Sequence, residues 1–400
     1  MLRRALLLVP LVLFLGRPRQ AEAGPVMISV NTTMAKANGM LDATASFTIN
    51  TGTTATPTTS FTLPDGQTFN GRVVNQANGP PIVVYDLTDL SIARRVDVSL
   101  TGMNPIAFLT TNNISISGAL DANGQNADGS RGGAGGAGGG NGGVATKDGS
   151  AAPGANTGQG MQGGNNTIPG GGGGGGYGGT GGAGTTAGQA VGNTKGGDGG
   201  AMYGQRDLSV LFGGGGGGGA KGASAAGGGG GGGAIMLFAE GDLSISGAVT
   251  ANGGRSSIAD ASYGGGGGAG GSILLEDCLP GEIQIKGRVS ARGGAGGDST
   301  TMAGAGGGGG GGRAYIADPD VSLDRVSVNG GVRGINSGKA QAEAGMMGTK
   351  VQGMSMNCTP EPSSFVLLVA GIGILAASRM KVAGPRSLIS QVWHGIRRLD

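Results

Sequence analysis

The chain has 400 residues, but 96 of them are glycine and only 13% are charged, so any apolar core must come from short segments between glycine tracts. The glycines follow no Gly-X-Y period and only 15 residues are proline, which excludes a collagen triple helix. Nine of the 27 basic and two of the 24 acidic residues lie in the terminal segments. The part between them carries 18 minus 22 charges, about −4, and has no electrostatic footprint for nucleic acid.

Residues 1–23 have the pattern of a cleavable signal peptide. Arg3 and Arg4 precede an apolar run from residue 5 to residue 15, and Ala21-Glu22-Ala23 supplies the small-x-small cleavage pattern. We predict export by the secretion machinery and a mature N-terminus at Gly24.

Residues 24–104 are rich in threonine and alternate apolar with polar side chains, as in residues 46–49 and 60–63. This alternation predicts short strands. We interpret the segment as an N-terminal β cap element that covers the strand edges at one end of the domain that follows.

An internal repeat runs through residues 105–335. Each copy contains two short alternating apolar segments interrupted by glycine, and the copies end at Gly124, Gly253, Gly293 and Gly330. The last three ends are separated by 40 and 37 residues, and Gly124 lies 129 residues before Gly253. A unit of this kind cannot bury its apolar face alone, but stacked copies can.

The repeat predicts an all-β fold, a right-handed parallel β-helix, which is a solenoid with Gly-rich loops. Leu243, Ile245 and Val249 of one copy should face inward, as should Ile283, Ile285 and Val289 of the next. Glycine runs such as 227–233, 264–268 and 306–312 should form loops before the next strand. A low-complexity insert at about 131–206 contains no convincing strand, and residues 207–212, just beyond it, offer one. The insert is either disordered or packed as extended polyglycine-like helices.

Motifs that carry chemistry are sparse. GxGxxG matches are expected by chance in such a composition, and Gly338-Lys339-Ala340 lacks the hydroxyl of a phosphate-binding loop. Residues 293–298, ending at Asp298, match the start of a calcium-binding nonapeptide, but Thr300 replaces its apolar residue and no tandem copy follows. We therefore predict no metal and no cofactor.

The exported part has no histidine, which excludes Ser-His-Asp and Cys-His catalysis there. Carboxylate pairs that could flank a sugar remain. The candidates are Glu276, Asp277 and Glu282 in one group and Asp318, Asp320 and Asp324 in the other. Asp277 and Asp318 also suit turns, where aspartate is common. Lys286, Arg288 and Arg292 form the one basic cluster, and alternation places Lys286 and Arg288 on the outer face.

Two cysteines, Cys278 and Cys358, both fall in the part predicted to be exported, so a disulfide and two free thiols are both open. Cys358 belongs to a predicted linker at 336–359.

The C-terminal region combines a motif, an apolar helix and positive charge. Pro360, Glu361 and Pro362 precede an uncharged stretch at 363–378, and Arg379 and Lys381 follow it. Sixteen helical residues rise roughly 24 Å, a short transmembrane helix. Residues 360–381 resemble the PEP-CTERM sorting signal. The resemblance implies export in a Gram-negative bacterium that makes exopolysaccharide, and processing by a membrane-embedded exosortase.

The chain continues for 19 residues after Lys381, unlike most such signals. Their apolar residues recur at helical spacing with arginines between them, so 382–400 should form a basic amphipathic tail on the cytoplasmic membrane face.

These features predict a non-enzymatic cell-surface or extracellular-matrix protein, associated with the envelope and with exopolysaccharide. Two alternatives remain open. One is a carbohydrate-active β-helix enzyme, a polysaccharide lyase or hydrolase. The other is an ice- or surface-binding protein, which requires aligned threonine ladders.

Overall fold

The computed structural model describes residues 38–164, 169–186, 196–257, 262–299, 303–336 and 341–354. Over these residues the fold is all-β with parallel sheets, and its one helical element is η1 (Leu323–Arg325), a single 3-10 turn. The predicted all-β class is therefore confirmed. No helix among these residues is long and apolar enough to cross a membrane. The predicted signal peptide, transmembrane helix and tail lie outside the described residues.

Three parallel sheets, here named I, II and III, contain most of the strands. Sheet I contains β5 (Arg72–Val74), β6 (Ile82–Leu87), β9 (Ile106–Thr110), β12 (Ala234–Ala239), β15 (Ser272–Asp277), β18 (Arg313–Ala317) and β20 (Thr349–Gln352). Sheet II contains β1 (Leu41–Ala43), β7 (Leu90–Ile92), β10 (Ile114–Ile116), β13 (Leu243–Ile245) and β16 (Ile283–Ile285). Sheet III contains β2 (Phe47–Asn50), β8 (Asp97–Thr101), β11 (Ala119–Asp121), β14 (Ala248–Thr250), β17 (Arg288–Ser290) and β19 (Val326–Ser327).

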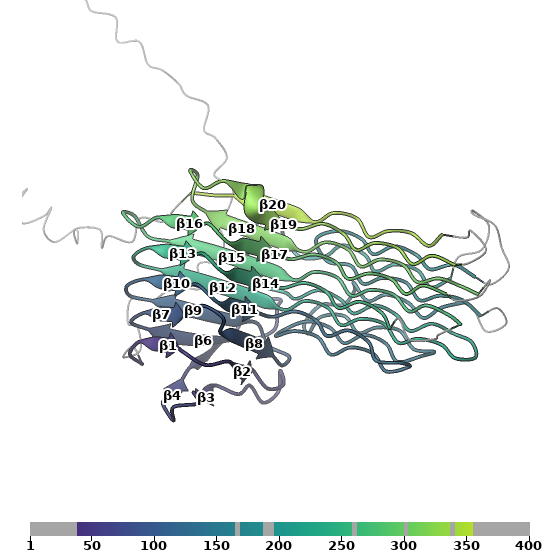
Figure 1. Cartoon of the computed structure of the whole chain (residues 1–400), viewed down its shortest axis with the longest axis horizontal. Coiled ribbons are helices and arrows are strands. Elements are labelled where there is room, and N and C mark those ends of the chain that lie inside the picture. The colour runs from purple at the N-terminus through teal and green to yellow at the C-terminus, as the bar shows by residue number, and fades with distance from the viewer. Residues whose placement is uncertain are drawn as a thin grey trace, which may run out of the picture. The chain divides into compact units, whose positions relative to one another are not determined.

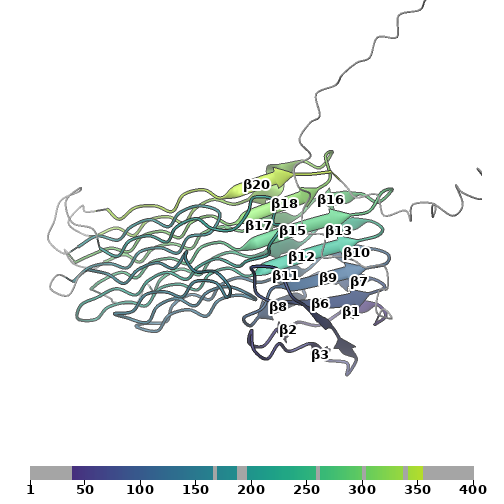
Figure 2. The same cartoon turned by 180° about the vertical axis from the view of Figure 1, so that it is seen from behind.

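The chain visits the three sheets in a fixed order. It passes from sheet I to sheet II to sheet III as β6-β7-β8, and repeats this as β9-β10-β11, β12-β13-β14 and β15-β16-β17. Each strand pairs in parallel with its counterpart in the next pass, apart from β5, which is antiparallel to β6. Figures 1 and 2 show the resulting columns of strands at one side of the body.

The register pairs the residues that the sequence repeat aligns. Ile116 lies opposite Ile245, which lies opposite Ile285, and Leu120, Val249 and Val289 form a second row. These side chains belong to one buried core between the sheets, although Ile285 on the last strand of sheet II is only partly buried. Alternation places every second residue inside, so the apolar pattern fixes the register.

The stacking begins earlier than the predicted boundary at 104/105. Strands β6, β7 and β8 already form a complete pass, and their residues Leu90-Ser91-Ile92 resemble Leu243-Ser244-Ile245 of a later copy. It also ends later, because β20 pairs with β18 inside the predicted linker. The strand pairing thus extends past both predicted limits of the repeat, because the first pass has no glycine between its two apolar segments and β20 is a single strand with no second segment.

An aromatic cluster covers the first pass. The antiparallel hairpin β3 (Ser60–Thr62) and β4 (Thr68–Asn70) places Phe61 and Phe69 in a stack with ring centroids 5.3 Å apart. Phe61 also contacts the Tyr85 ring at 4.9 Å in an edge-to-face arrangement. Phe69 and Tyr85 are fully buried, so this hairpin shields the apolar end of the core from water.

The five central strands of sheet I, from β6 to β18, are buried on both faces. Its outer face carries Met236, Phe238 and Leu274, which pack against residues 203–212 in a second apolar cluster. Residues 207–212 are not the predicted strand; Leu208, Leu211 and Phe212 are instead buried on this face from a turn and an irregular segment. The Arg313 guanidinium donates to the Tyr203 carbonyl at 2.8 Å and lies over the Tyr177 ring, 5.2 Å from its centroid.

After sheet III, the later passes leave the strands and return to sheet I through glycine-rich excursions. We call these excursions the glycine lattice; it comprises the described residues within 122–233, 251–271, 291–312 and 328–348. Its segments run side by side away from the strands (Figure 1). The glycine runs are therefore not simple loops. The insert at 131–206, where it is described, is packed rather than disordered, and most of its glycines are buried.

Hydrogen bonds in the lattice have a period of three. In residues 264–271, the N–H groups of Gly264, Gly267 and Gly270 donate to Gly304, Gly307 and Gly310 at 2.9–3.0 Å. The N–H groups of Gly266 and Ala269 donate to the carbonyls of residues 218 and 215, on a second segment. Those of Gly268 and Gly271 donate to the carbonyls of residues 254 and 251, on a third segment. One segment thus binds three neighbours. Three residues per turn is the repeat of a polyproline-II-type helix, which has no internal hydrogen bonds and must find partners outside itself.

The lattice requires glycine because neighbouring carbonyl groups pack directly against its α-carbons. A β-carbon added at Gly268 would lie 2.0 Å from the Gly230 oxygen, and one at Gly266 would lie 1.9 Å from the Gly173 oxygen. Real β-carbons essentially never make contacts shorter than 3.0 Å. A few alanines, such as Ala269 and Ala305, occupy buried positions where the β-carbon is accommodated.

We predict that Gly268→Ala lowers the free energy of unfolding by about 3 kcal/mol, because hydrogen-bonded backbone on the neighbouring segment must move. The matched control is Ala305→Gly, which removes a tolerated β-carbon and should cost about 1 kcal/mol. Urea denaturation of both variants measures the difference. Equal destabilisation by the two substitutions would contradict a steric requirement for glycine.

Candidate functional site

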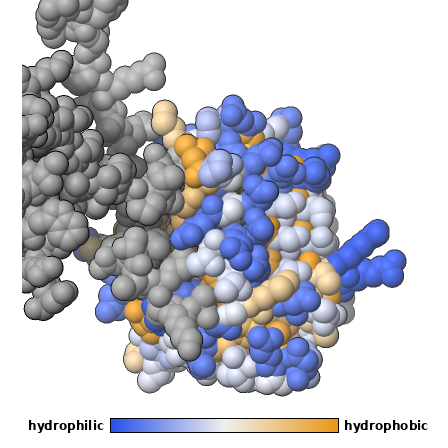
Figure 3. All heavy atoms as spheres, turned by 90° about the vertical axis from the view of Figure 1, so that its left-hand side faces the viewer, coloured by the Kyte–Doolittle hydropathy of each residue, from blue (hydrophilic) through white to orange (hydrophobic). Residues whose placement is uncertain are grey.

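Polar side chains at the turns form ladders that bind the backbone of the next pass. Before sheet II, the side-chain oxygens of Asp89, Asn113 and Asp242 accept from the N–H groups of Asn113, Asp242 and Glu282, at 3.2, 2.8 and 3.2 Å. This part of the body is seen in Figure 3, where hydrophilic residues cover much of the visible face. The ladder satisfies backbone donors that the strands leave unpaired.

A second ladder lies where sheet III meets the glycine lattice. Asn123 Oδ1 accepts from Asn252 N at 2.6 Å, and Asn252 Oδ1 accepts from Arg292 N at 2.8 Å. Asn252 Oδ1 also accepts from Ser290 Oγ at 2.6 Å. An open cavity of about 480 Å³ lies beside these groups, lined by Asp121, Asn126 and neighbouring residues. Its polar groups are mostly engaged with the protein itself.

Sheet II ends one strand early, and the fourth copy of the repeat explains why. Val326 pairs with Val289, so positions 37 residues apart correspond. Asp324 then stands where Gly287 and Gly247 stand in earlier copies, and a β-carbon at Gly287 would lie 1.9 Å from the Gly247 oxygen. Val321 and Leu323 are also shifted by one residue relative to Ile283 and Ile285, which reverses their alternation. The chain makes η1 here instead of a sixth strand.

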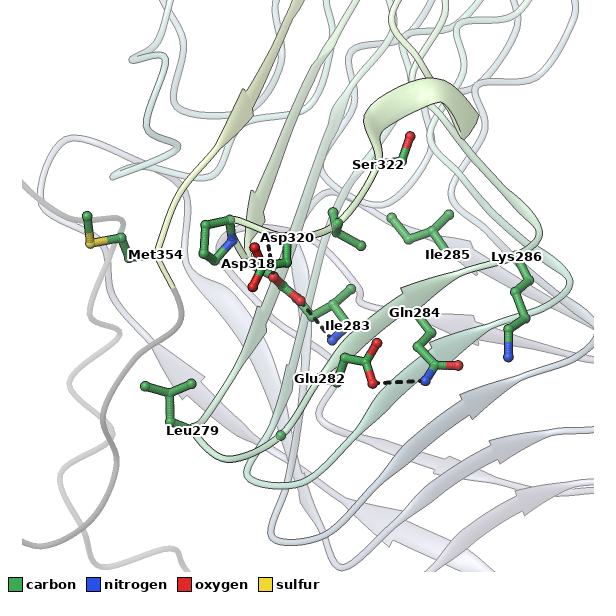
Figure 4. A pocket seen from close by; sticks show the side chains of 13 residues that line it. Leu279, Glu282, Ile283, Gln284, Ile285, Lys286, Asp318, Asp320, Ser322 and Met354 are labelled. Atoms are coloured by element: carbon green, nitrogen blue, oxygen red, sulfur yellow. Dashed lines mark hydrogen bonds between the residues drawn. The ribbon is translucent and has the colours of Figure 1, made fainter.

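The missing strand leaves an open cavity of about 830 Å³ beside β16. Its apolar lining includes Ile283, Ile285 and Val321, and its polar lining includes the carboxyl groups of Glu282, Asp318 and Asp320 and the Lys286 amine. Figure 4 shows these side chains around the opening, with Leu279 and Met354 at one side. It is larger than the cavity beside the second ladder.

Most carboxyl groups in this cavity are already hydrogen-bonded. Asp318 Oδ2 accepts from Ile283 N at 3.1 Å, where a strand partner would otherwise bind, and Asp318 Oδ1 accepts from Asp320 N at 2.8 Å. Glu282 Oε2 accepts from Gln284 Nε2 at 3.0 Å. Gln352 Nε2 holds the same turn through the carbonyls of Asp318, Pro319 and Val321 at 2.6–3.1 Å. Asp318 therefore closes the edge of the sheet.

Glu276 and Asp277 lie at the end of β15 and are completely buried. Glu276 shares a face with Phe238 and Ala317, its partners on the adjacent strands, and neither of its oxygens has a hydrogen-bond partner among the described residues. Desolvation by burial, followed by the nearby charge of Asp277, raises the pKa of Glu276 to about 8. A carboxyl group with such a pKa is protonated at neutral pH.

The structure separates the predicted catalytic groups. Glu276 and Asp277 are in the interior, Glu282, Asp318 and Asp320 line the large cavity, and Asp324 is exposed in η1. Sequence reasoning did not find the cavity itself, although Pro319 and the glycine replaced by Asp324 were signals of a broken repeat.

The remaining predicted site residues have simpler positions. Lys286, Arg288 and Arg292 are at the surface, as expected for Lys286 and Arg288, and Arg292 Nε donates to Ser327 Oγ at 2.6 Å. Asp298 Oδ1 accepts from Ile335 N at 2.8 Å. No group of three or more potential metal ligands occurs in the described residues. Cys278 is buried and disulfide-bonded.

Several predicted residues lie outside the described residues. They are the signal cleavage residues Ala21, Ala23 and Gly24, the cysteine Cys358, the residues Thr300 and Lys339-Ala340, and the sorting residues Pro360, Glu361, Pro362, Arg379 and Lys381. The chain matches no protein-family model, and no curated protein or solved structure is significantly similar to it.

We predict that stability falls as the pH rises from 4.5 to 8, in part through Glu276. The folded state holds a proton that the unfolded chain, with a pKa near 4.5, releases over this range. Each pH unit then costs up to about 1.4 kcal/mol, and the loss ends above pH 8. Glu276→Gln should flatten this slope, as measured by urea denaturation at several pH values. An identical slope in both proteins would show that Glu276 does not carry the effect.

Proposed function

We propose that the chain is a non-enzymatic exported protein of the cell surface or extracellular matrix. Its body would be a right-handed parallel β-helix that carries the glycine lattice, associated with exopolysaccharide and sorted through its C-terminal signal. The observation that carries the structural role is the lattice itself, in which backbone groups of the glycine segments bind three neighbouring segments at once. Such packing gives a stiff scaffold whose integrity does not depend on a bound ligand.

The polar groups of the body support the same role. Asp89, Asn113 and Asn123 bind backbone of the next pass rather than one another. Asn and Asp at such positions stabilise turns. The body thus uses its polar side chains chiefly to hold successive passes in register.

The surface groups support contact with an acidic polysaccharide. Lys286, Arg288 and Arg292 lie at the surface within seven residues of each other, on and beside the last complete pass. Because the exported part has a small negative net charge, such binding would depend on this local cluster and weaken with added salt.

Export and sorting rest on the ends of the sequence. The basic start, apolar run and Ala21-Glu22-Ala23 pattern support a signal peptide, and Pro360-Glu361-Pro362 with the following apolar stretch supports a sorting signal. An exosortase-like enzyme would then act on the chain after its export.

Two epitope tags test the sorting proposal, one after Gly24 and one after Asp400. If the C-terminal signal is processed, the tags should separate, with the first tag on an exported body that has lost residues 379–400. Substituting both Pro360 and Pro362 with alanine should keep the tags on one polypeptide, as detected by fractionation and immunoblotting. A matched pair of alanine substitutions at Pro80 and Pro81, inside the body, should leave processing unchanged. Tags that remain together in the unaltered protein would contradict processing and leave a simple membrane span.

The cavity beside β16 favours one second candidate, a carbohydrate-active enzyme. Glu282 and Asp320 would be its acid and base, since two carboxyl groups that flank a sugar can cleave a glycosidic bond. This alternative predicts that the protein releases oligosaccharides from exopolysaccharide and that Glu282→Gln abolishes release, measured as reducing ends. Binding of the polymer without release, in both proteins, is what the scaffold proposal expects.

A further inference from the structure

The glycine lattice contains limbs that leave sheet III and limbs that return to sheet I. Each outgoing limb donates to the next outgoing limb, as Gly253 N does to the Arg292 carbonyl at 2.8 Å. Each return limb donates to the next return limb, as Gly308 N does to the Glu343 carbonyl at 2.9 Å. These bonds form two columns and all point the same way along the stack. The outgoing limbs lie within 122–127, 251–256, 291–299 and 328–336, and the return limbs within 132–137, 227–233, 264–271, 304–312 and 341–348.

The first limb of each column has acceptors without donors. Inside the lattice, the Asn252 and Gly266 carbonyls accept from N–H groups of the preceding limbs at 2.8 and 2.9 Å. The first pass forms no such limb, because residues 102–105 connect β8 directly to β9. Four equivalent carbonyls therefore accept no hydrogen bond from the described residues, and their residues are half-buried or exposed: Asn123, Asn126, Gly132 and Gly135. Asn123 and Asn126 also line the open cavity of about 480 Å³.

The last limb of each column has donors without acceptors. Inside the lattice, the N–H groups of Gly293 and Gly311 donate to the following limbs at 2.9 and 2.8 Å. Four equivalent N–H groups at the end of the columns donate to none of the described residues, and they belong to Gly330, Arg333, Ala344 and Met347. Gly330 is half-buried and the other three are exposed. The two ends of the lattice are thus complementary, with the same spacing of three residues.

The stack of strands limits how a second copy can fit. Strands β8 and β2 precede β11 in sheet III, whereas the first outgoing limb follows β11. The strands therefore extend past the first limbs, as Figures 1 and 2 show. They would collide with the strands of a copy placed in direct continuation.

A half turn about the direction of stacking removes the collision. Outgoing and return limbs alternate along the stack, because Gly331 N bonds back to Gly309 and Gly345 N bonds back to Gly331. The series begins and ends with a return limb, since Gln125 N bonds back to Ala134. The next position after the last limb thus belongs to the outgoing column. A half turn exchanges the columns and reverses their direction, so the first return limb of the turned copy fills that position with its chain parallel.

We propose that copies of this chain assemble head to tail through the ends of the glycine lattice. The N–H groups of Gly330 and Arg333 bind the Gly132 and Gly135 carbonyls of the next copy. Those of Ala344 and Met347 bind its Asn123 and Asn126 carbonyls. Unpaired backbone edges bind another chain readily, and a contact between two different surfaces continues into a filament instead of closing. Such assembly goes beyond the proposed surface role, which does not require it.

Proline removes single donors without bending a limb, because its φ suits the polyproline-II conformation and it has no N–H. The full-length chain in a mild detergent should form species larger than a dimer as its concentration rises, as measured by sedimentation velocity. Arg333→Pro with Met347→Pro should raise the concentration required for assembly about tenfold, because each junction loses two hydrogen bonds. Thermal melting of the monomer should not change, since neither N–H is paired within it.

Two matched variants separate the donors from the side chains. Arg333→Ala with Met347→Ala keeps both N–H groups and should assemble like the unaltered protein. Val332→Pro lies in the same limb but should not affect assembly. Its N–H corresponds to that of Arg255, which faces the side-chain ladder and donates to Asn126 Oδ1 at 3.0 Å.

Mixing tests the polarity of the contact. The double proline variant keeps its free carbonyls, so it can bind the end of an assembly but cannot extend it, and it should shorten assemblies of the unaltered protein. A monomer at every concentration, or equal assembly by the proline and alanine variants, would overturn the proposal. Assembly that stops at a dimer would indicate a contact between like ends and also overturn it. None of these outcomes changes the separation of tags expected from sorting.

Discussion

The structure depends on the close approach of carbonyl oxygens to glycine α-carbons in the lattice. A polyproline-II-type segment has no hydrogen bonds of its own, so each buried N–H must find an acceptor on a neighbour. That neighbour can come near only if no side chain intervenes, as at Gly268, where a β-carbon would meet the Gly230 oxygen. The high glycine content, which removes side chains from a core, therefore permits a core made of backbone. The entropy lost in ordering glycine is offset by hydrogen bonding in three directions.

The sequence was informative wherever side chains alternate and uninformative where there are none. The inward rows of Ile116, Ile245 and Ile285 can be aligned from the repeat alone, because a one-residue slip would expose them. The lattice left two interpretations open, since glycine runs of similar length carry no mark of which segment each will pair with. Residues 207–212 look like a strand by apolar content, but their side chains cover sheet I from an irregular segment.

The candidate site could be predicted only in part, because its cavity arises where a copy of the repeat fails to form a strand. Its carboxyl groups were visible in the sequence, but the cavity comes from an absent strand. That absence follows from Asp324 at a corner that admits only glycine and from a shift of Val321 and Leu323 out of phase. Asp318 then takes the hydrogen bond that the missing strand would have made. The Asp318 carboxylate, which the sequence offered as a catalytic group, is thus hydrogen-bonded to the edge strand of sheet II. Glu276 is buried and protonated at neutral pH.

The three-residue period of hydrogen bonding in the lattice also limits which insertions its segments can accept. Residues 264, 267 and 270 all face one neighbouring segment, so three residues inserted into each of two paired limbs extend both by one turn and keep every donor in phase. One or two inserted residues rotate the rest of the limb by a third or two thirds of a turn, and the donors beyond then point at the wrong neighbours. An insertion of nine bases in the gene therefore keeps the donors in phase when the paired limb gains the same three residues, whereas an insertion of three or six bases does not.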